Sequence, residues 1–311
     1  MKFEVRTDAR NQNAQYISFA DTKLGTGIIR DFTKYVADAY NYVSSFESPF
    51  SNKIMNPARW RNFKYNKKVY LNGSNDFREL IGKYKGQTLF ICGNGYSLKD
   101  NVDLLKGVDG KVMALNGAID LLPKVDFFMA LEWTSHLKLK QMTYDVPAIL
   151  AISCNPNIIK KFPNKYFIQD NRHSELENKI REKVPGMFGI DVNLEVGFSA
   201  LHVAWLLGFT KIVTIGFEHC YSAPEKIHAT EDFKDTKEML KLELDDGTIV
   251  FSNGAMMVGA ATIKAAFYFL RKQGVRIIEC SNGLIDEECE MMPLIEAIGE
   301  ADLGIKTSQS K

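Results

Sequence analysis

The sequence contains no long hydrophobic run. No apolar stretch approaches the ~20 residues that a helix needs to cross a bilayer. The first fifteen residues, MKFEVRTDARNQNAQ, also lack the apolar core of a secretory signal peptide. These absences predict a cytoplasmic protein without a membrane span.

Cysteines are few, scattered and odd in number: Cys92, Cys154, Cys220, Cys280 and Cys289. No two of them form a Cys-x-x-Cys pair, so the spacing argues against a zinc cluster. Cys92 and Cys280 lie in apolar runs, where we expect them to be small core residues. The whole pattern is typical of a reducing compartment.

An excess of charge of either sign is missing too. The 311 residues carry a net charge of +1, which gives no overall case for binding nucleic acid or a membrane surface. Hydrophobic residues make up 45% and charged residues 25% of the chain, as in ordinary globular proteins. The length allows one large domain or two modest ones.

Periodicity divides the chain into three parts. Residues 1–84 are rich in Asn, Ser, Tyr and Phe and show poor periodicity, so we expect an irregular, partly helical N-terminal extension with one helix from Thr26 to Ser44. Residues 85–300 alternate regularly and form the predicted nucleotide-binding domain. Residues 301–311 have the composition of a polar tail.

One run in the extension, from Arg59 to Lys68, interleaves basic and aromatic residues as RWRNFKYNKK. Such a run can grip nucleic acid or a polyanionic acceptor through charge and stacking. The alternative is a solvated face whose aromatic side chains pack on the core. The nearly neutral net charge favours the second interpretation, although it leaves nucleic acid open.

From Gln87 onward, short apolar runs alternate with helix-like stretches. The runs span residues 88–92, 111–115, 125–131, 146–153, 165–169, 211–217 and 275–280. The clearest helices are expected over residues 199–207 and 256–272, the second followed by Gly274 as a C-terminal cap. Nearly all-apolar strands between helices predict an α/β, Rossmann-like fold, with a mostly parallel sheet covered on both faces.

Polar residues follow most of these predicted strands. In an open α/β sheet, ligands bind outside the carboxyl ends of the strands, near the point where strand order reverses. Six segments follow predicted strands: Gly93 to Ser97, Asn116-Gly117, Glu132 to Thr134, Ser153 to Asn155, Gly216 to Tyr221, and Ser281 to Gly283. A seventh, Gly197 to Ser199, stands before a predicted helix. Several such ends on one rim predict a polar site for a nucleotide-type ligand.

The turn after the first run is Gly93-Asn94-Gly95, followed by Ser97. The two glycines would let the backbone approach a phosphate, and Asn94 and Ser97 would hydrogen-bond to it or to a ribose. The alternative is a tight turn with Ser97 capping a helix. The turn lacks the third glycine of a dinucleotide fingerprint, so we do not expect a dinucleotide site.

Three further residues are candidates for the same ligand. Asn116 would bind the nucleotide, unless it is only a turn residue. Gly197 and Ser199 begin a predicted helix and form either a second cradle for a phosphate or carboxylate, or a plain cap at Ser199.

Acid–base chemistry has three candidates. Glu218 follows a buried run and could orient a sugar hydroxyl, hold a metal or pair with a histidine. His219 could act as acid or base, because the ordinary histidine pKa lies near neutrality. His228 lies in the polar loop 227–233, which could close over the site. For Glu218 and His219, the alternative is a structural role in a hydrogen-bond network on the rim. For His228, the alternative is a place in a solvated loop.

Should a divalent metal such as Mg²⁺ be needed, Glu132 and Glu218 are the candidate ligands, with substrate phosphates completing the oxygen coordination. His136, His173 and His202 have weaker claims on function. The acidic run over residues 286–290 is expected to be solvated surface.

The order of these motifs resembles a known family. CGNGYSL is similar to the GNGPSL-type loop of bacterial CMP-sialic-acid-dependent sialyltransferases, of the related Maf motility-accessory proteins and of the MptE-like family, and Asn116 in ALNGA matches an asparagine there. The block VGFSALHVAWLLGFTKIVTIGFEHCY resembles the Maf and MptE-like pattern. The resemblance covers roughly residues 85–297. Tyr96 replaces the usual proline, Glu218 the usual Asp, and Met257 the sialyltransferase histidine.

This resemblance implies a glycosyltransferase that uses a nucleotide-activated sugar, most simply a CMP-linked sialic or related nonulosonic acid, with a small-molecule or glycan acceptor left open. His219 or His228 would then deprotonate the acceptor. The MptE-like branch implies instead diphosphate transfer from ATP to a pterin alcohol with magnesium. A third hypothesis, motivated by the basic-aromatic run and the missing histidine, is a non-catalytic protein that binds a nucleotide or polyanion.

Overall fold

A computed structural model of the chain describes residues 6–8, 11–16, 49–170, 175–190, 195–222, 240–244, 246–252 and 254–302. The helix expected from Thr26 to Ser44 lies outside the described residues. So do His173, the loop that contains His228, and residues 303–311 of the expected tail.

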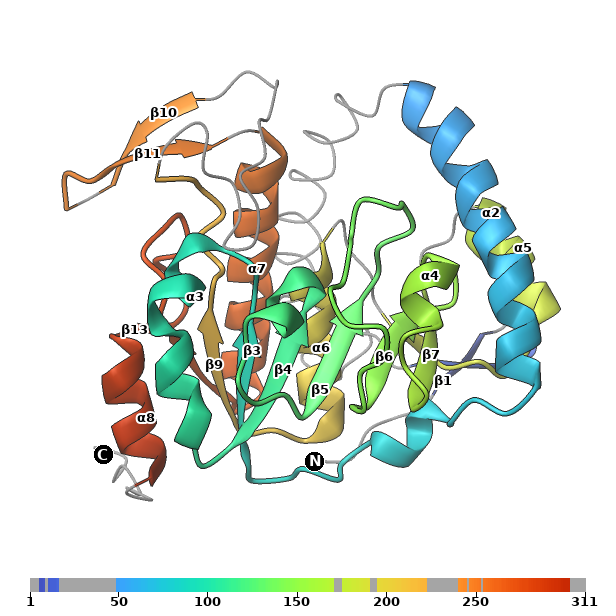
Figure 1. Ribbon diagram of the computed structural model, residues 1–311, viewed down its shortest axis with the longest axis horizontal. Helices are drawn as coiled ribbons and strands as arrows, with labels where there is room; N and C mark the ends of the chain where they lie inside the picture. Colours follow the sequence, from blue (N-terminus) through green and yellow to red (C-terminus); the bar gives the residue numbers. More distant parts are fainter. Residues whose placement is uncertain are drawn as a thin grey trace.

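The centre of the molecule is a mostly parallel sheet that contains all seven predicted strands (Figure 1). These are β3 (Thr88–Cys92), β4 (Lys111–Leu115), β5 (Phe127–Ala130), β6 (Ala148–Ala151), β7 (Lys165–Asp170), β9 (Lys211–Ile215) and β12 (Arg276–Glu279). Short strands β8 (Gly189–Ile190) and β13 (Glu290–Met291) extend the two sides, and β1 (Arg6–Asp8) and β2 (Asn11–Tyr16) lie beyond β8. A separate antiparallel hairpin consists of β10 (Leu240–Glu243) and β11 (Ile249–Ser252).

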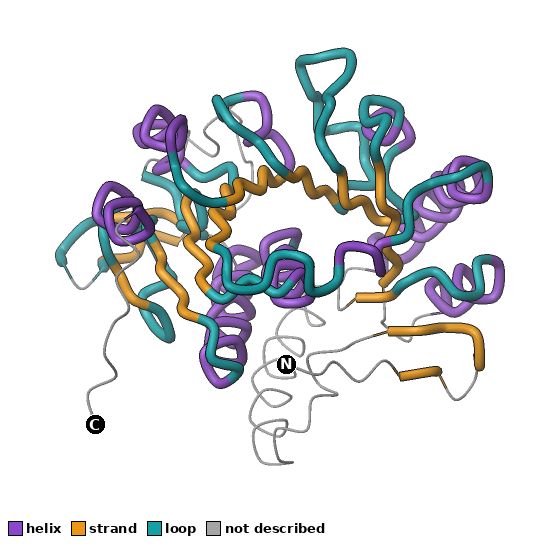
Figure 2. Tube along the Cα trace, turned by 90° about the horizontal axis from the view of Figure 1, so that it is seen from below, coloured by secondary structure: helices purple, strands orange, loops and turns teal. Residues whose placement is uncertain are grey.

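Helices cover both faces of this sheet, as Figure 2 shows. They are α2 (Pro49–Leu71), α3 (Tyr96–Asn101), α4 (Pro156–Ile159), α5 (Glu175–Lys183), α6 (Val196–Leu207), α7 (Gly254–Lys272) and α8 (Leu294–Asp302). Three short 3₁₀ segments are η2 (Phe77–Leu80), η3 (Val102–Gly107) and η4 (Asn116–Asp120). Helices α6 and α7 pack in one core, and α2, α3, α4, α5 and α8 contribute to the other.

The alternation of side chains along each strand explains these two cores. On β3, Leu89 and Ile91 belong to the core under α6 and α7, whereas Phe90 and Cys92 belong to the opposite core. Successive strand residues point to opposite faces, so a strand covered on both sides must be apolar throughout. The continuous apolar runs of the sequence therefore predicted the strands correctly, and the predicted Rossmann-like α/β fold is confirmed.

The order of the strands reverses beside β3. The sheet runs β8-β7-β6-β5-β4-β3-β9-β12-β13, so the chain proceeds from β3 in one direction and returns to β9 on the other side of β3. The loops after β3 and β9 leave their strands at this reversal. A crevice at the carboxyl ends of such strands is the usual ligand position in this class of fold.

The basic-aromatic run forms part of α2. Phe63 is buried in the core, and Arg59 is buried where its guanidinium pairs with Glu177 of α5 and hydrogen-bonds the Ser153 hydroxyl. Lys64 points to solvent on the same helix. The run is therefore an amphipathic helix whose buried side includes an aromatic and a basic residue, in line with the second interpretation of its sequence.

The acidic run lies on the surface, as expected. Asp286 pairs with Lys264 at 2.5 Å, and Glu288 pairs with Arg271 at 2.9 Å. Among the helices of the described ranges, none is both long and apolar enough to cross a membrane.

Candidate functional site

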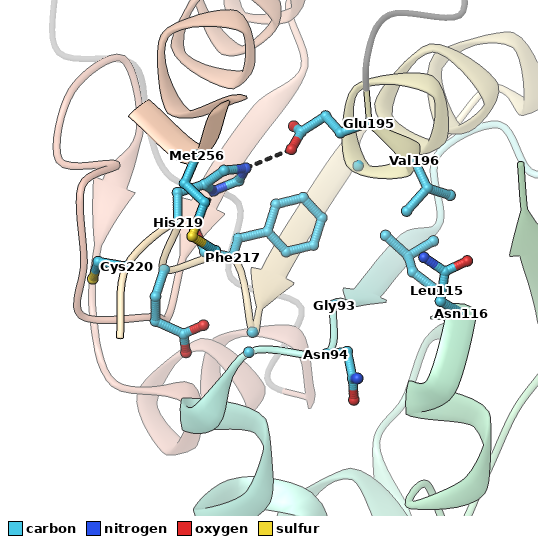
Figure 3. Close-up of a pocket in the computed structure, with 14 residues that line it drawn as sticks. Gly93, Asn94, Leu115, Asn116, Glu195, Val196, Phe217, His219, Cys220 and Met256 are labelled. Carbon is cyan, nitrogen blue, oxygen red and sulfur yellow. Dashed lines mark hydrogen bonds and ion pairs between the residues drawn. The ribbon is translucent and has the colours of Figure 1, made fainter. Parts of the chain in front are cut away.

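A pocket of about 280 Å³ lies at the reversal of strand order, at the carboxyl ends of β3, β4 and β9 (Figure 3). It is lined by Gly93, Asn94, Gly95, Leu115, Asn116, Glu195, Val196, Gly197, Gly216, Phe217, Glu218, His219, Cys220 and Met256. Seven of the residues proposed from sequence are in this list: Gly93, Asn94, Gly95, Asn116, Gly197, Glu218 and His219. The structure therefore brings most of the predicted nucleotide-binding residues into one place.

The two glycines of the first turn face the β9 loop at very short range. A Cβ atom at Gly93 would lie 2.3 Å from the carbonyl oxygen of Gly216, and one at Gly95 would lie 1.5 Å from Oε2 of Glu218. The Gly95 N–H donates to the Gly216 carbonyl at 3.1 Å. The sequence predicted that the glycines let the backbone approach a phosphate. The structure gives a further reason for glycine here, because the backbones of the β3 and β9 loops pack directly against each other.

Ser97 does not cap a helix, and that alternative for its role is wrong. Helix α3 begins at Tyr96, with Gly95 as its N-cap and no side-chain cap bond. The Ser97 hydroxyl instead accepts from the Gly216 N–H at 3.2 Å, and the Ser97 N–H donates to Oε1 of Glu218 at 2.7 Å. Ser97 therefore joins the two loops and is not among the residues that line the pocket.

The alternative that Ser199 caps a helix is also wrong. Helix α6 begins at Val196, with Glu195 in the N-cap position, so Ser199 lies one turn inside the helix. It is fully buried and does not line the pocket. Only Gly197 of that pair reaches the site, where its lack of a side chain leaves room for Phe217, whose ring lies 2.8 Å from where a Cβ would stand.

Glu218 is a buried carboxyl group at the junction of the loops. Burial raises its pKa, and this effect exceeds the opposing hydrogen bonds from Ser97. Because the orphan N–H groups at a helix start attract anions, the carboxylate occupies a favourable position beside α3. The Ser97 donor that the sequence offered to a phosphate is thus already occupied.

His219 and Glu195 form an ion pair on the wall of the pocket (Figure 3). Nε2 of His219 lies 2.6 Å from Oε2 of Glu195, and Nδ1 lies 2.8 Å from the carbonyl oxygen of Phe217. Since both partners are acceptors, both ring nitrogens donate when the imidazole is protonated. Burial alone would lower the pKa of His219, but the Glu195 carboxylate and the Phe217 carbonyl outweigh it and raise the pKa to about 9.

The sequence did not single out Glu195. Its only sequence feature is its position just before the Val196-Gly197 helix start, where acidic residues are common for reasons of capping alone. In the structure Oε2 pairs with His219, while Oε1 is buried without a hydrogen-bond partner among the described residues. Oε1 of Glu195 is therefore a buried acceptor without a partner in the described part of the chain, on a residue that lines the pocket.

Asn116 offers a second such acceptor. It adopts a left-handed backbone conformation (φ 50°) at the end of β4, which asparagine tolerates better than most residues. Its Oδ1 atom is buried and has no hydrogen-bond partner within the described part of the chain. Because a buried amide oxygen costs free energy when unpaired, this position favours a ligand that donates to it.

Of the two predicted metal ligands, Glu218 lines the pocket and Glu132 does not. Oε1 of Glu132 accepts from the Thr134 N–H at 2.7 Å, at the end of β5. Strand β5 is three places from β9 in the sheet, which separates the strands by about 14 Å. No cluster of three or more His, Cys, Asp or Glu suited to a metal occurs within the described ranges.

The remaining described histidines lie outside the pocket. His202 is fully buried in α6 with its ring centroid 6.0 Å from that of Trp205, and His136 is exposed beyond β5. These positions outside the pocket agree with the expectation that His136 and His202 are weaker candidates for a functional role.

A doubly wound parallel sheet with a polar pocket at its switch point defines a Rossmann-like α/β protein. A family model described as 6-hydroxymethylpterin diphosphokinase MptE-like matches residues 61–224, which is more than half of the chain. The chain belongs to this MptE-like family, and the resemblance noted from its motifs is confirmed. The match begins at residue 61, inside α2, and ends just after the β9 loop.

Among solved structures, the chain is similar to a Maf glycosyltransferase from Magnetospirillum magneticum AMB-1. The two share 16% sequence identity with a TM-score of 0.49, and the similarity covers 71% of this chain and 39% of the other. The chain thus spans about two fifths of that protein. A search of curated proteins gave no match.

Proposed function

We propose that the chain is a nucleotide-dependent transferase whose donor is a nucleotide-activated sugar, a CMP-linked sialic or related nonulosonic acid. The observation that carries the proposal is the convergence of the β3, β4 and β9 loops on one pocket. That pocket combines close-approach glycines, the Asn116 side chain with its buried, unpartnered amide oxygen, and the cationic His219. Amide and backbone groups suit a ribose or a pyrimidine, and the cation suits a phosphate.

The charge of the pocket supports a donor with one phosphodiester. Among the described lining residues, His219 is the one side chain that carries a positive charge at neutral pH. A CMP-linked nonulosonic acid carries two negative charges at neutral pH, on its phosphodiester and its carboxylate, whereas a nucleoside triphosphate carries three or four. Because Glu195 already pairs with His219, the less negative CMP-linked donor suits the described side chains better than a triphosphate does without an added cation.

The proposed reaction is a direct displacement. The acceptor hydroxyl oxygen attacks the anomeric carbon, the carbon–oxygen bond to phosphate breaks, and its electron pair stays on the phosphate oxygen of CMP. The acceptor proton passes to Oε1 of Glu195, which lines the pocket without another described partner. His219 stabilises the developing phosphate charge.

His219 was also a candidate base. It could take the acceptor proton only after losing one of its present hydrogen bonds, since Glu195 and Phe217 engage both nitrogens. Glu195 therefore takes this role in the proposal. His228, outside the described residues, stays a prediction.

A second candidate is diphosphate transfer from ATP to a pterin alcohol, which the description of the matching family model favours. It requires more positive charge at the phosphates than His219 supplies, and magnesium would provide that charge. Of the predicted metal ligands Glu132 and Glu218, only Glu218 lines the pocket.

The two candidates differ in donor and in metal dependence. We expect the purified protein to release CMP from a CMP-linked nonulosonic acid, with undiminished rate in the presence of a chelator and loss of activity in Glu195→Gln. AMP release from ATP with a pterin alcohol, abolished by the chelator, would establish the second candidate in its place. Absence of turnover with both donors, despite nucleotide binding, would leave the non-catalytic hypothesis.

A further inference from the structure

The loop after β12, residues 281–284, lies directly behind the pocket-lining β9 loop. Just before this loop, β12 ends at Glu279, whose carboxyl group is fully buried. Oε1 of Glu279 accepts from the Ser281 N–H at 2.6 Å, and its other oxygen accepts from the Thr214 hydroxyl on β9. Each oxygen of this buried carboxyl group therefore has a partner, and the start of the loop is fixed.

From this fixed start the loop contacts both sides of Glu218. The Ser281 hydroxyl accepts from the Phe217 N–H at 2.9 Å, and the Leu284 N–H donates to the Glu218 carbonyl oxygen at 2.9 Å. Gly283 allows this approach, because a Cβ there would lie 2.3 Å from that carbonyl oxygen. Residues 217 and 218 are thus held from behind by their backbone.

The next residue, His219, needs such support. It has a left-handed backbone conformation (φ 52°), which is uncommon for residues other than glycine and persists when the surroundings determine it. The Phe217 carbonyl accepts from Nδ1 of His219, so the same peptide segment that Ser281 anchors also orients the imidazole. On the other side, the Ser252 hydroxyl donates to the His219 carbonyl at 2.9 Å.

We propose that Ser281, itself held by Glu279, is a positioning residue that sets the backbone of Phe217 and thereby directs His219 onto Glu195. Glu279 and Ser281 lie on β12 and in the loop after it, beyond the segment matched by the family model. The inference deepens the proposed function, because it assigns the support of the His219–Glu195 pair. It can nevertheless be tested without any substrate.

The test uses the short hydrogen bond between His219 and Glu195, which should give a low-field proton resonance in the free protein. Its assignment requires loss of the resonance in His219→Asn and in Glu195→Gln. We expect Ser281→Ala to remove the resonance, and Ser281→Thr, which keeps the hydroxyl, to restore it. Nucleotide binding, measured in parallel by calorimetry, should weaken at least about 5-fold in Ser281→Ala, because His219 is no longer held in place in the pocket.

The matched control is Thr214→Val, which removes the other hydrogen bond to Glu279 from the same buried region but leaves Ser281 in place. It should keep both the resonance and the affinity. Where Ser281→Ala does not fold, Ser281→Cys replaces it, since a thiol accepts hydrogen bonds poorly and should also lose the resonance.

The proposal is overturned when Ser281→Ala keeps the resonance, when Ser281→Thr fails to restore it, or when Thr214→Val loses it equally. If the proposed function is wrong, the experiment gives a different result. In that case the wild-type protein binds no nucleotide, while the resonance still responds to Ser281 as described.

Discussion

A methyl group at Gly95 would enter space that the Glu218 side chain occupies. The added Cβ would lie 1.5 Å from Oε2 of Glu218 and 2.7 Å from the Gly216 carbonyl oxygen. The carboxylate can turn away, but the backbone oxygen cannot. We therefore expect Gly95→Ala to separate the β3 and β9 loops, to destabilise the fold by about 1–3 kcal/mol and to abolish CMP binding. Urea unfolding and calorimetry measure the two effects.

The control for this substitution is Gly107→Ala. No atom lies within 4 Å of the Cβ position there, and the backbone is not left-handed. Its stability should stay within about 0.5 kcal/mol of wild type, with unchanged binding. Equal effects at the two glycines would contradict the packing argument.

Residue roles were only partly predictable from sequence. Gly93, Gly95 and Asn116 stood out because they follow predicted strands, where ligands bind in an open α/β sheet. For Ser97 and Ser199 both the ligand role and the alternative of a cap were open, because helix starts cannot be placed to one residue from sequence. Glu195 was missed because its partner, His219, is 24 residues away and only the return of the chain to β9 brings them together.

At the scale of elements, the buried pair of Arg59 and Glu177 holds α2 against α5. Glu177 is 2% exposed, so Arg59→Met would take the guanidinium partner away from a buried carboxylate. We expect a loss of about 3–5 kcal/mol in the free energy of unfolding, measured in urea. The double variant Arg59→Met with Glu177→Met should recover most of that loss.

An exposed ion pair on α5 can be compared with the buried pair of Arg59 and Glu177. Lys179 and Glu175 lie 2.5 Å apart on the surface of α5, where solvent screens their attraction. Lys179→Ala should leave the urea unfolding midpoint nearly unchanged. A loss in Arg59→Met no larger than that in Lys179→Ala would show that α2 does not depend on its buried pair.

The strands were the elements best predicted by sequence. A parallel strand covered on both faces is apolar at every position, and this gives short uninterrupted runs that turn residues delimit. Short 3₁₀ segments such as η4 (Asn116–Asp120) and the edge strand β13 (Glu290–Met291) were not predicted, since two to five residues carry too little periodicity.

At the scale of the whole molecule, stability should fall as pH rises from about 5 to 9. Burial raises the pKa of Glu279 from 4.5 to about 7, so the folded state holds that proton more tightly than the unfolded state between those values. The pKa of His219 rises from 6.5 to about 9, so its contribution is complete below pH 6.5 and is lost as pH rises through 9.

The His219 part of this dependence corresponds to roughly 3 kcal/mol. Urea unfolding of wild type and His219→Asn at pH 6, 7.5 and 9.5 separates the contributions. His219→Asn should remove the decline above pH 6.5 and leave that of Glu279. A wild-type stability that is constant between pH 6.5 and 9 would refute the ion pair.

The central claim is that the pocket between the β3, β4 and β9 loops binds the nucleotide. Calorimetric titration of CMP into wild type and Asn116→Ala tests this, with Asn72→Ala in the exposed turn just after α2 as control. We expect CMP to bind wild type and Asn72→Ala alike, and Asn116→Ala to bind at least about 5-fold more weakly because a buried acceptor is lost. No CMP binding by wild type, or equal binding by Asn116→Ala, would contradict it.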